Sequence, residues 1–225
     1  MPNALRIEVP PQPIETWKAH YASNQGHRYW PCEELVRALA GKRHFNTLME
    51  VGCGNGANLW MLAEHADEVV GVDSCPEALK AASSYMRKRN TVGRVQLVES
   101  DIRRLPRRAG TTSGLVDVMT SQHVPLSEQA ELLHGFWSAL KPGGWYFRYA
   151  LAPGCTMTDA ESVELHTYKD LPKLFPGTGP VFLPPEARLH TMLLRAGFTI
   201  LRQSYITREY HGGAVARYSI TEAHA

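Results

Sequence analysis

A glycine-rich turn and one acidic residue have the types and spacing needed to bind a nucleoside. The turn, Gly52-Cys53-Gly54-Asn55-Gly56, directly follows the apolar segment Thr47–Val51. Glycine accepts a positive φ and lets a ligand come close to the main chain. Asp73 follows Gly52 by 21 residues, near the spacing of about 20 that is typical of a carboxylate that binds ribose hydroxyls. These residues predict a cofactor that contains a nucleoside.

Glu50, two positions before the first glycine of the turn, helps to distinguish two kinds of nucleoside cofactor. The run Gly52 to Ala57 also fits the dinucleotide pattern G-x-G-x-x-G/A, so an NAD-dependent oxidoreductase is one alternative. Glu50, however, would repel an anionic pyrophosphate and attract an ammonium group. Only about 70 residues follow the fifth predicted strand, which leaves little chain for a second catalytic region. Both observations favour a cofactor with an amino group.

His123 is the candidate proton acceptor. It follows the predicted strand Leu115–Met119 by a few residues. An imidazole titrates near neutrality, so it suits general-base work on a hydroxyl or an amine. The alternative is a histidine that only packs or forms hydrogen bonds in its loop.

The elements that must position these residues alternate between strands and helices. Strands linked by helices through short turns predict an α/β fold, a Rossmann-like three-layer sandwich with a mostly parallel sheet. A short glycine-containing link joins the last two strands, so the final strand should run antiparallel to its neighbour. The predicted strands are 47–51, 68–73, 95–99, 115–119, 145–151, 198–207 and 214–221, and the fifth follows a turn at 141–144.

Several motifs in this order resemble the signatures of class I S-adenosylmethionine-dependent methyltransferases. They are Leu48–Gly56, Val70–Asp73, Glu99–Ile102, Val116–Pro125, Leu140–Gly144 and Arg195–Phe198. The resemblance covers residues 45–150 well and 184–221 loosely. It implies a seven-stranded sheet with the last strand inserted antiparallel. It also implies S-adenosylmethionine as cofactor, S-adenosylhomocysteine as product, and no metal.

The resemblance also assigns roles to individual residues. Glu50 would meet the ammonium of the cofactor, Asp73 its ribose, and Asp101 with Ile102 its adenine. Ser121 and Gln122 would line the path to the methyl group. The complete set of expected cofactor contacts is Glu50, Gly52, Cys53, Gly54, Asp73, Ser74, Asp101, Ile102, Ser121, Gln122 and Arg28.

The resemblance divides the chain into a lid and a cofactor-binding domain. Residues 1–44 are expected to form a helical lid, and residues 45–225 the S-adenosylmethionine-binding domain with a variable substrate segment at about 152–184. Arg28 could pair with the cofactor carboxylate through two parallel hydrogen bonds. Aromatic residues of the lid could instead simply pack on the sheet. The candidate substrate contacts are Tyr21, Trp30, His166 and Tyr168.

Charge and composition limit the partners. The net charge of +2 and a pI near 8.4 are too mild to indicate nucleic-acid binding. No run of about 18 apolar residues is present, so we expect no membrane span. The four cysteines lack the spacing of a metal site or a disulfide framework, which favours a reducing cytoplasm. A basic cluster, Arg103, Arg104, Arg107 and Arg108, is either a solvated loop or an attractor of acidic substrate or RNA.

The sequence therefore predicts a methyltransferase of class EC 2.1.1.- that modifies an oxygen or nitrogen of a small molecule. We expect a monomer or homodimer without nucleic-acid or membrane partners. An RNA or protein methyltransferase is an alternative, favoured only by the arginine cluster. A non-catalytic cofactor-binding partner subunit is a further alternative, as is the NAD-dependent oxidoreductase.

Overall fold

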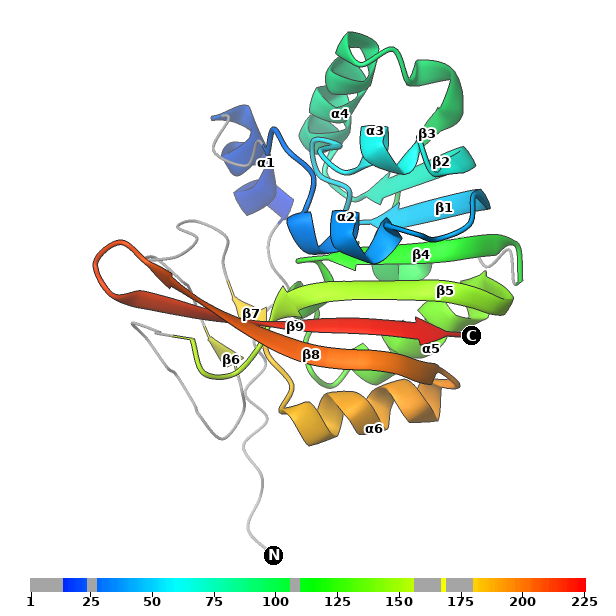
Figure 1. Cartoon of the computed structure of the whole chain (residues 1–225). Helices are drawn as coiled ribbons and strands as arrows, with labels where there is room; N and C mark the ends of the chain where they lie inside the picture. The colour runs from blue at the N-terminus through cyan, green and yellow to red at the C-terminus, as the bar shows by residue number, and fades with distance from the viewer. Residues whose placement is uncertain (1–13, 24–27, 106–109, 156–166, 169–179) are drawn as a thin grey trace, which may run out of the picture.

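The computed structural model describes residues 14–23, 28–105, 110–155, 167–168 and 180–225. Strands and helices alternate along most of the chain and build three layers (Figure 1). Within the described ranges, seven strands form one sheet in the order β3-β2-β1-β4-β5-β9-β8. The strands are β1 Phe45–Val51, β2 Ala66–Asp73, β3 Val95–Glu99, β4 Thr112–Val118, β5 Leu140–Leu151, β8 Thr199–Tyr210 and β9 Ala214–His224.

The last strand lies inside the sheet and not at its edge. β9 pairs antiparallel with β5 on one side and with β8 on the other. The neighbouring pairs among β1 to β5 are all parallel. The predicted α/β fold with an inserted antiparallel last strand is thus confirmed. A separate two-stranded ladder joins β6 Thr167–Tyr168 to β7 Val181–Phe182.

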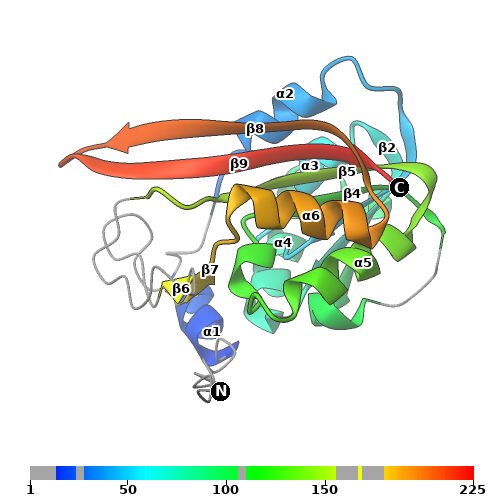
Figure 2. The ribbon, with the colours of Figure 1, turned by 90° about the horizontal axis from the view of Figure 1, so that it is seen from below.

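Helices cover both faces of the sheet because successive side chains of each strand point to opposite sides. Leu48 packs with α2 and α3, whereas its neighbour Met49 packs with α5 and α6. Figure 2 shows α2 on one side of the sheet and α5 with α6 on the other. The helices are α1 Ile14–Ala22, α2 Glu33–Leu39, α3 Leu59–Leu62, α4 Pro76–Lys88, α5 Gln129–Ala139 and α6 Glu186–Ala196, with short 3-10 turns η1 Val92–Arg94, η2 Ile102–Arg104 and η3 Ser121–His123.

The segment before Trp145 differs from the prediction of a turn. It belongs to β5, which begins at Leu140. The register with β4 moves from Thr112–Leu140 to Gly114–Trp145, so extra residues bulge out of the ladder. The bulge is held by Ala225, whose carbonyl accepts the N–H of Gly143 at 2.7 Å and whose N–H donates to Gly144 at 3.0 Å. The sequence showed the glycines of this bulge but not the partner that holds it.

The hairpin of β8 and β9 is longer than predicted and extends past the sheet. The last pair between β5 and β9 is Leu151 with Tyr218, yet β9 begins at Ala214 and β8 continues to Tyr210. Figures 1 and 2 both show this two-stranded arm projecting beyond the rest of the sheet. None of the helices in the described ranges is long and apolar enough to cross a membrane.

Candidate functional site

The glycine-rich turn follows β1 and is fixed by the acidic residue at the end of β2. β1 and β2 lie side by side in parallel, with Val51 opposite Val72. Gly54 has a φ of +54°, and its N–H donates to Asp73 Oδ2 at 2.8 Å. Asp73 Oδ1 accepts the N–H of Cys75 at 2.9 Å. Each carboxylate oxygen keeps a further lone pair for a ligand hydroxyl. The predicted pair of turn and carboxylate is therefore a single hydrogen-bonded unit.

Glu50 is a buried carboxylate beneath this turn. Its side chain is only 2% exposed, and Oε1 accepts a hydrogen bond from Asn58 Nδ2 at 2.6 Å. Oε2 is buried and has no hydrogen-bond partner among the described residues. Burial raises the pKa of Glu50 to about 8, and the charge of Arg28 acts in the opposite direction. A buried acceptor of this kind needs a donor, and the ammonium of an amino-acid group fits it.

Two asparagines support the site, and sequence analysis missed both. Asn58 accepts the N–H of Cys32 at 2.8 Å and so ties Glu50 to the start of α2. Asn55 exchanges two hydrogen bonds with the backbone of Arg28, at 3.2 and 2.7 Å. Asn55 lies inside the turn and Asn58 follows it closely. Their positions could have identified both asparagines from the sequence. They hold the segment that precedes β1 against the glycine-rich turn.

Helix α1 places an aromatic residue directly over the turn. The hydroxyl of Tyr21 lies so close to Gly54 that a Cβ there would collide with it. Burial raises the pKa of Tyr21 well above its usual range, and the negative charge of Asp73 adds to this. Tyr21, predicted as a substrate contact, is thus beside the expected cofactor contacts. Cys53, another predicted cofactor contact in the turn, points its thiol toward Gly71 in β2.

His123 lies in η3 with both ring nitrogens engaged. Nδ1 is 3.2 Å from the carbonyl oxygen of Pro180, which can only accept, so Nδ1 carries the proton. Nε2 is 3.4 Å from Gln122 Nε2 and accepts from it. The ring also stands edge-on to the indole of Trp17, with centroids 5.2 Å apart. Burial lowers the pKa of His123 to about 4. These contacts favour the alternative in which His123 packs and positions its neighbours.

The side chains of Ser121 and Gln122, predicted to line the path to the methyl group, are buried and hydrogen-bonded to β5. They are 3% and 2% exposed. Ser121 Oγ accepts from Arg148 Nε at 3.1 Å, and Gln122 Oε1 accepts the N–H of Leu151 at 2.9 Å. Both side chains fix η3 to β5, because the buried polar groups of that strand need partners. Any contact of these residues with the cofactor would come from their backbone.

A buried ion pair that sequence analysis missed lies under η3. Asp117 in β4 and Arg148 in β5 are register partners, and Arg148 Nε is 3.7 Å from Asp117 Oδ2. They are 0% and 1% exposed. Asp117 Oδ1 accepts the N–H of Ser121 at 3.0 Å, and Arg148 Nη1 donates to Ser219 at 2.7 Å. In the sequence, Asp117 is the acidic residue of one otherwise mostly apolar strand and Arg148 the basic residue of the next. These two positions could have predicted the ion pair.

Asp101 has its carboxylate occupied by a residue of its own loop. Arg103 donates to it from Nε at 3.0 Å and from Nη2 at 2.6 Å. Burial opposes the change, but these hydrogen bonds lower the pKa of Asp101. Arg103 also binds Glu128 at 3.0 Å. Ile102, the other predicted adenine contact, is partly buried against the core under α5 and α6. The adenine contact stays a prediction.

The remaining predicted contacts lie in different places, and part of them falls outside the described residues. Trp30 is 73% exposed and lies beside Arg89 at the end of α4, with the guanidinium 5.9 Å from its ring. Ser74 is exposed next to Asp73. For Tyr168 only the backbone, in β6, belongs to the description. His166, Arg107 and Arg108 lie outside the described residues.

The comparisons with known proteins point to one family. A family model described as a methyltransferase domain matches residues 48–144. The ubiquinone biosynthesis O-methyltransferase of Bordetella bronchiseptica is 30% identical over 141 residues, which cover 60% of this chain and 53% of that protein. Residues 48–144, somewhat less than half of the chain, are therefore similar to a methyltransferase domain. The chain spans about half the length of that relative.

Solved structures show the same fold as this chain at low sequence identity. The N-methyltransferase NodS from Bradyrhizobium japonicum WM9, in complex with S-adenosyl-l-homocysteine, gives a TM-score of 0.65 at 14% identity and covers 93% of this chain and 98% of its own. The cyclase SpnF gives a TM-score of 0.68 at 16% identity, covering 96% and 97%. Since one neighbour is named a methyltransferase and the other a cyclase, the fold alone does not specify the reaction.

Proposed function

We propose that this chain transfers a methyl group from S-adenosylmethionine to an oxygen or nitrogen of a small molecule. The observation that carries the proposal is the unpaired, buried Oε2 of Glu50 beneath the turn that Asp73 fixes. An ammonium group at Glu50 and a ribose near Asp73 would be held at the two ends of one hydrogen-bonded turn. This pair of contacts suits a nucleoside linked to an amino acid better than it suits a dinucleotide pyrophosphate.

The protein's part in this reaction is binding and alignment. When bound, the cofactor supplies an electrophilic methyl group on a sulfonium, and the carbon–sulfur electron pair returns to sulfur as the nucleophile bonds to carbon. Most of the acceleration of such a displacement comes from holding the reacting atoms in line. Glu50 and Asp73 would fix the two ends of the cofactor, and Tyr21 with Trp17 on α1 would exclude water. Residues 1–44 are the lid in this proposal, and a variable segment at 152–184 completes the substrate side.

A small-molecule substrate is supported by the relatives and by the charge pattern. The relative from Bordetella bronchiseptica is named an O-methyltransferase and the structural neighbour NodS an N-methyltransferase. Arg103, part of the basic cluster that favoured RNA, is bound by Asp101 and Glu128. A reducing, cytoplasmic setting belongs to the proposal because the four cysteines are free thiols.

Calorimetric titration with S-adenosylhomocysteine, with NAD as control, tests the cofactor. We expect saturable binding of S-adenosylhomocysteine alone. Incubation with a labelled methyl donor and a panel of phenols, sugars and amines then tests transfer. Binding of NAD alone would support the oxidoreductase alternative. Binding of S-adenosylhomocysteine without transfer to any acceptor would favour a cofactor-binding protein that does not methylate by itself.

A further inference from the structure

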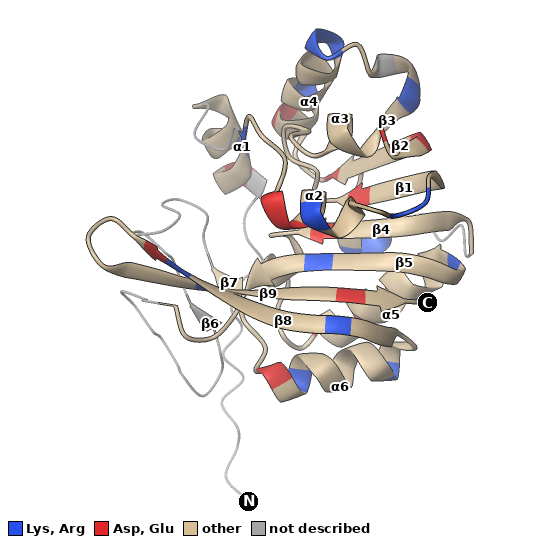
Figure 3. Cartoon of the chain, viewed as in Figure 1, with Lys and Arg blue, Asp and Glu red and all other residues tan. Residues whose placement is uncertain are grey.

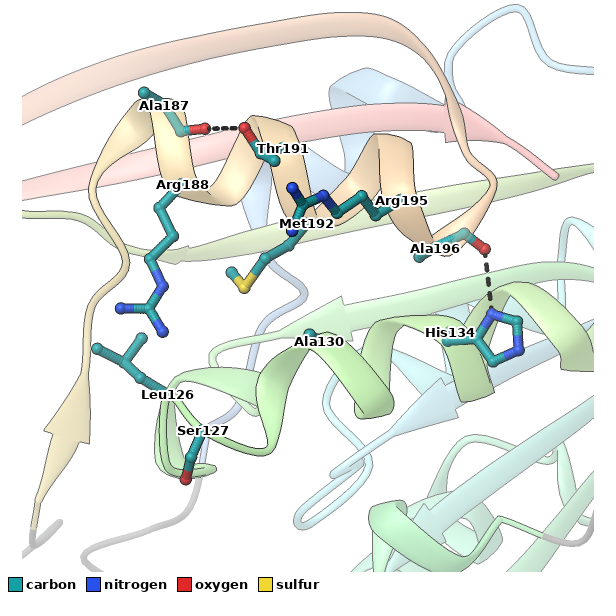
Figure 4. Close-up of a pocket in the computed structure, with 10 residues that line it drawn as sticks. All are labelled: Leu126, Ser127, Ala130, His134, Ala187, Arg188, Thr191, Met192, Arg195 and Ala196. Atoms are coloured by element: carbon teal, nitrogen blue, oxygen red, sulfur yellow. Dashed lines mark hydrogen bonds between the residues drawn. The ribbon is translucent and has the colours of Figure 1, made fainter. Parts of the chain in front are cut away.

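A groove lies between α5 and α6, on the face of the sheet opposite α2 and α3. Its volume is about 670 Å³. Leu126, Ala130 and His134 line it from the α5 side, and Arg188, Met192 and Arg195 line it from α6 (Figure 4). The nucleoside-binding turn contributes no lining residue. The groove is therefore a separate feature from the candidate active site.

The lining of the groove combines a positive rim with an apolar floor. No Asp or Glu lies among its described lining residues. Of the acidic residues that flank it in sequence, Glu128 binds Arg103 at 3.0 Å and Glu186 binds Arg217. Glu131 follows Ala130 and is exposed, but it is not a lining residue. Neither Arg188 nor Arg195 forms an ion pair within the described part of the chain. Figure 3 shows basic positions near both ends of α6. The groove is thus complementary to a ligand that is both acidic and apolar.

Arg188 occupies a position that the stability of α6 itself does not explain. It lies in the first turn of α6, which begins at Glu186. The N-terminal end of a helix carries partial positive charge, so a cation there is unfavourable. Arg195, in the last turn, is favourable for the helix. Figure 4 shows the guanidinium of Arg188 directed across the groove toward Leu126, before the start of α5. An anionic partner at this point would offset the unfavourable placement of Arg188.

The spacing of the two arginines indicates the shape of the ligand. Seven residues separate Arg188 from Arg195, which is two helical turns, or about 10 Å along the axis. A single phosphate or carboxylate cannot reach both. A second helix with two acidic residues seven positions apart presents them at the same spacing as the two arginines. Ala130, which is exposed, and Met192, of which 7% is exposed, offer a small apolar surface between the arginines on which such a helix can pack.

We propose that this groove binds an amphipathic acidic helix of a partner protein. Its two carboxylates, seven residues apart, would pair with Arg188 and Arg195. Aliphatic residues between them would cover Met192 and Ala130. At the far end, His134 already donates from Nδ1 to the carbonyl oxygen of Ala196 at 3.3 Å and so joins the two helices there. The groove thus has one fixed end at His134 and an open end at Arg188.

The test uses a fluorescent, alanine-based helical peptide of about 15 residues. It carries two glutamates seven positions apart with leucines between them, and a matched peptide carries glutamines instead. We expect saturable binding of the glutamate peptide by anisotropy, weakened by salt, and at least tenfold weaker binding of the glutamine peptide. The double variant Arg188→Gln/Arg195→Gln should bind the glutamate peptide at least tenfold more weakly. The control Arg43→Gln/Arg202→Gln should stay within twofold of the unchanged protein.

Other outcomes would overturn the proposal. Equal binding of both peptides, no binding of the glutamate peptide, or no effect of the double variant would each do so. A protein dimer in sedimentation that the double variant disrupts would assign the groove to a second copy of this chain. An RNA oligonucleotide that binds in place of the peptide would assign it to nucleic acid. Binding of S-adenosylhomocysteine, measured in all variants, should not change and serves as the check of folding.

Discussion

The N–H of Gly54 and the carboxylate of Asp73 are joined by a hydrogen bond of 2.8 Å, which connects the turn after β1 to the end of β2. Asp73, the residue expected to bind the ribose, therefore also fixes the glycine-rich turn that would contact the rest of the cofactor. Burial raises the pKa of Asp73, and the N–H groups of Cys75 and Gly54 oppose this. Loss of the carboxylate should disturb both parts of the site together.

Replacement of Asp73 tests this double role. We expect Asp73→Ala to weaken S-adenosylhomocysteine binding at least tenfold in calorimetry. It should also destabilise the free protein by about 1–3 kcal/mol in urea unfolding, because buried N–H groups lose a charged acceptor. Asp67→Ala is the matched control, since Asp67 lies on the same strand in an exposed pair with His44. An Asp73→Ala protein of unchanged affinity would remove Asp73 from the ribose role.

Glu50 should couple cofactor binding to the release of a proton. Its pKa of about 8 means that the free protein holds a proton on Glu50 at pH 7. An ammonium stabilises the carboxylate, so binding at pH 7 should release up to one proton. Calorimetry in buffers with different ionisation enthalpies measures this number. Affinity should rise between pH 6 and pH 7.5, before the amine of the ligand begins to lose its own proton at about 8.

The variant Glu50→Gln gives the matching control for this titration. It cannot release a proton, so its binding enthalpy should not depend on the buffer. The free variant should gain stability relative to the unchanged protein as pH rises from about 4.5 to 8. Over that range the raised pKa of Glu50 makes the folded state lose stability. Proton release equal in both proteins would show that another group titrates.

His123 is expected to act by position and not as a strong base. Its pKa of about 4 lies below the usual 6.5, so its contribution to stability is present above pH 6.5 and is lost between pH 6.5 and 4. His123→Asn should therefore flatten the acid side of the stability profile. Once a substrate is known, the His123→Asn variant should transfer methyl groups at a rate within about tenfold of the unchanged protein. A loss of about 10²–10⁴ would instead indicate general-base catalysis.

The pair of Asp117 and Arg148 predicts a non-additive effect on stability. Arg148→Met leaves Asp117 buried without its cation and should cost about 3–5 kcal/mol. The double variant Asp117→Asn/Arg148→Met removes both charges and should recover much of that loss. Urea unfolding of the single and double variants measures the difference, with the exposed Arg202→Met as control. Additive losses would show that the two charges do not interact.

The sequence predicted the fold well because the fold depends on local patterns. The alternation of strands with helices and the short link before Ala214 predicted a mostly parallel sheet with an antiparallel last strand. The insertion of that strand inside the sheet was implied only by the family resemblance. The glycines and Asp73 were recognisable because their roles depend on backbone position. The directions of the side chains of Ser121, Gln122 and Asp101 were not predictable in this way. They depend on Arg148 and Arg103, whose positions only the folded chain defines.

The placement of β9 between β5 and β8 also has a consequence for the order of assembly. β8 precedes β9 in the chain, yet within the described sheet it pairs with β9 alone. The half made of β1 to β5 can form as the chain emerges from the ribosome, because its strands pair among themselves. β8 can join the sheet only through β9, so the edge of β5 stays unpaired until β9 pairs with it. We therefore expect the closure of that gap to be the last step in the formation of the sheet.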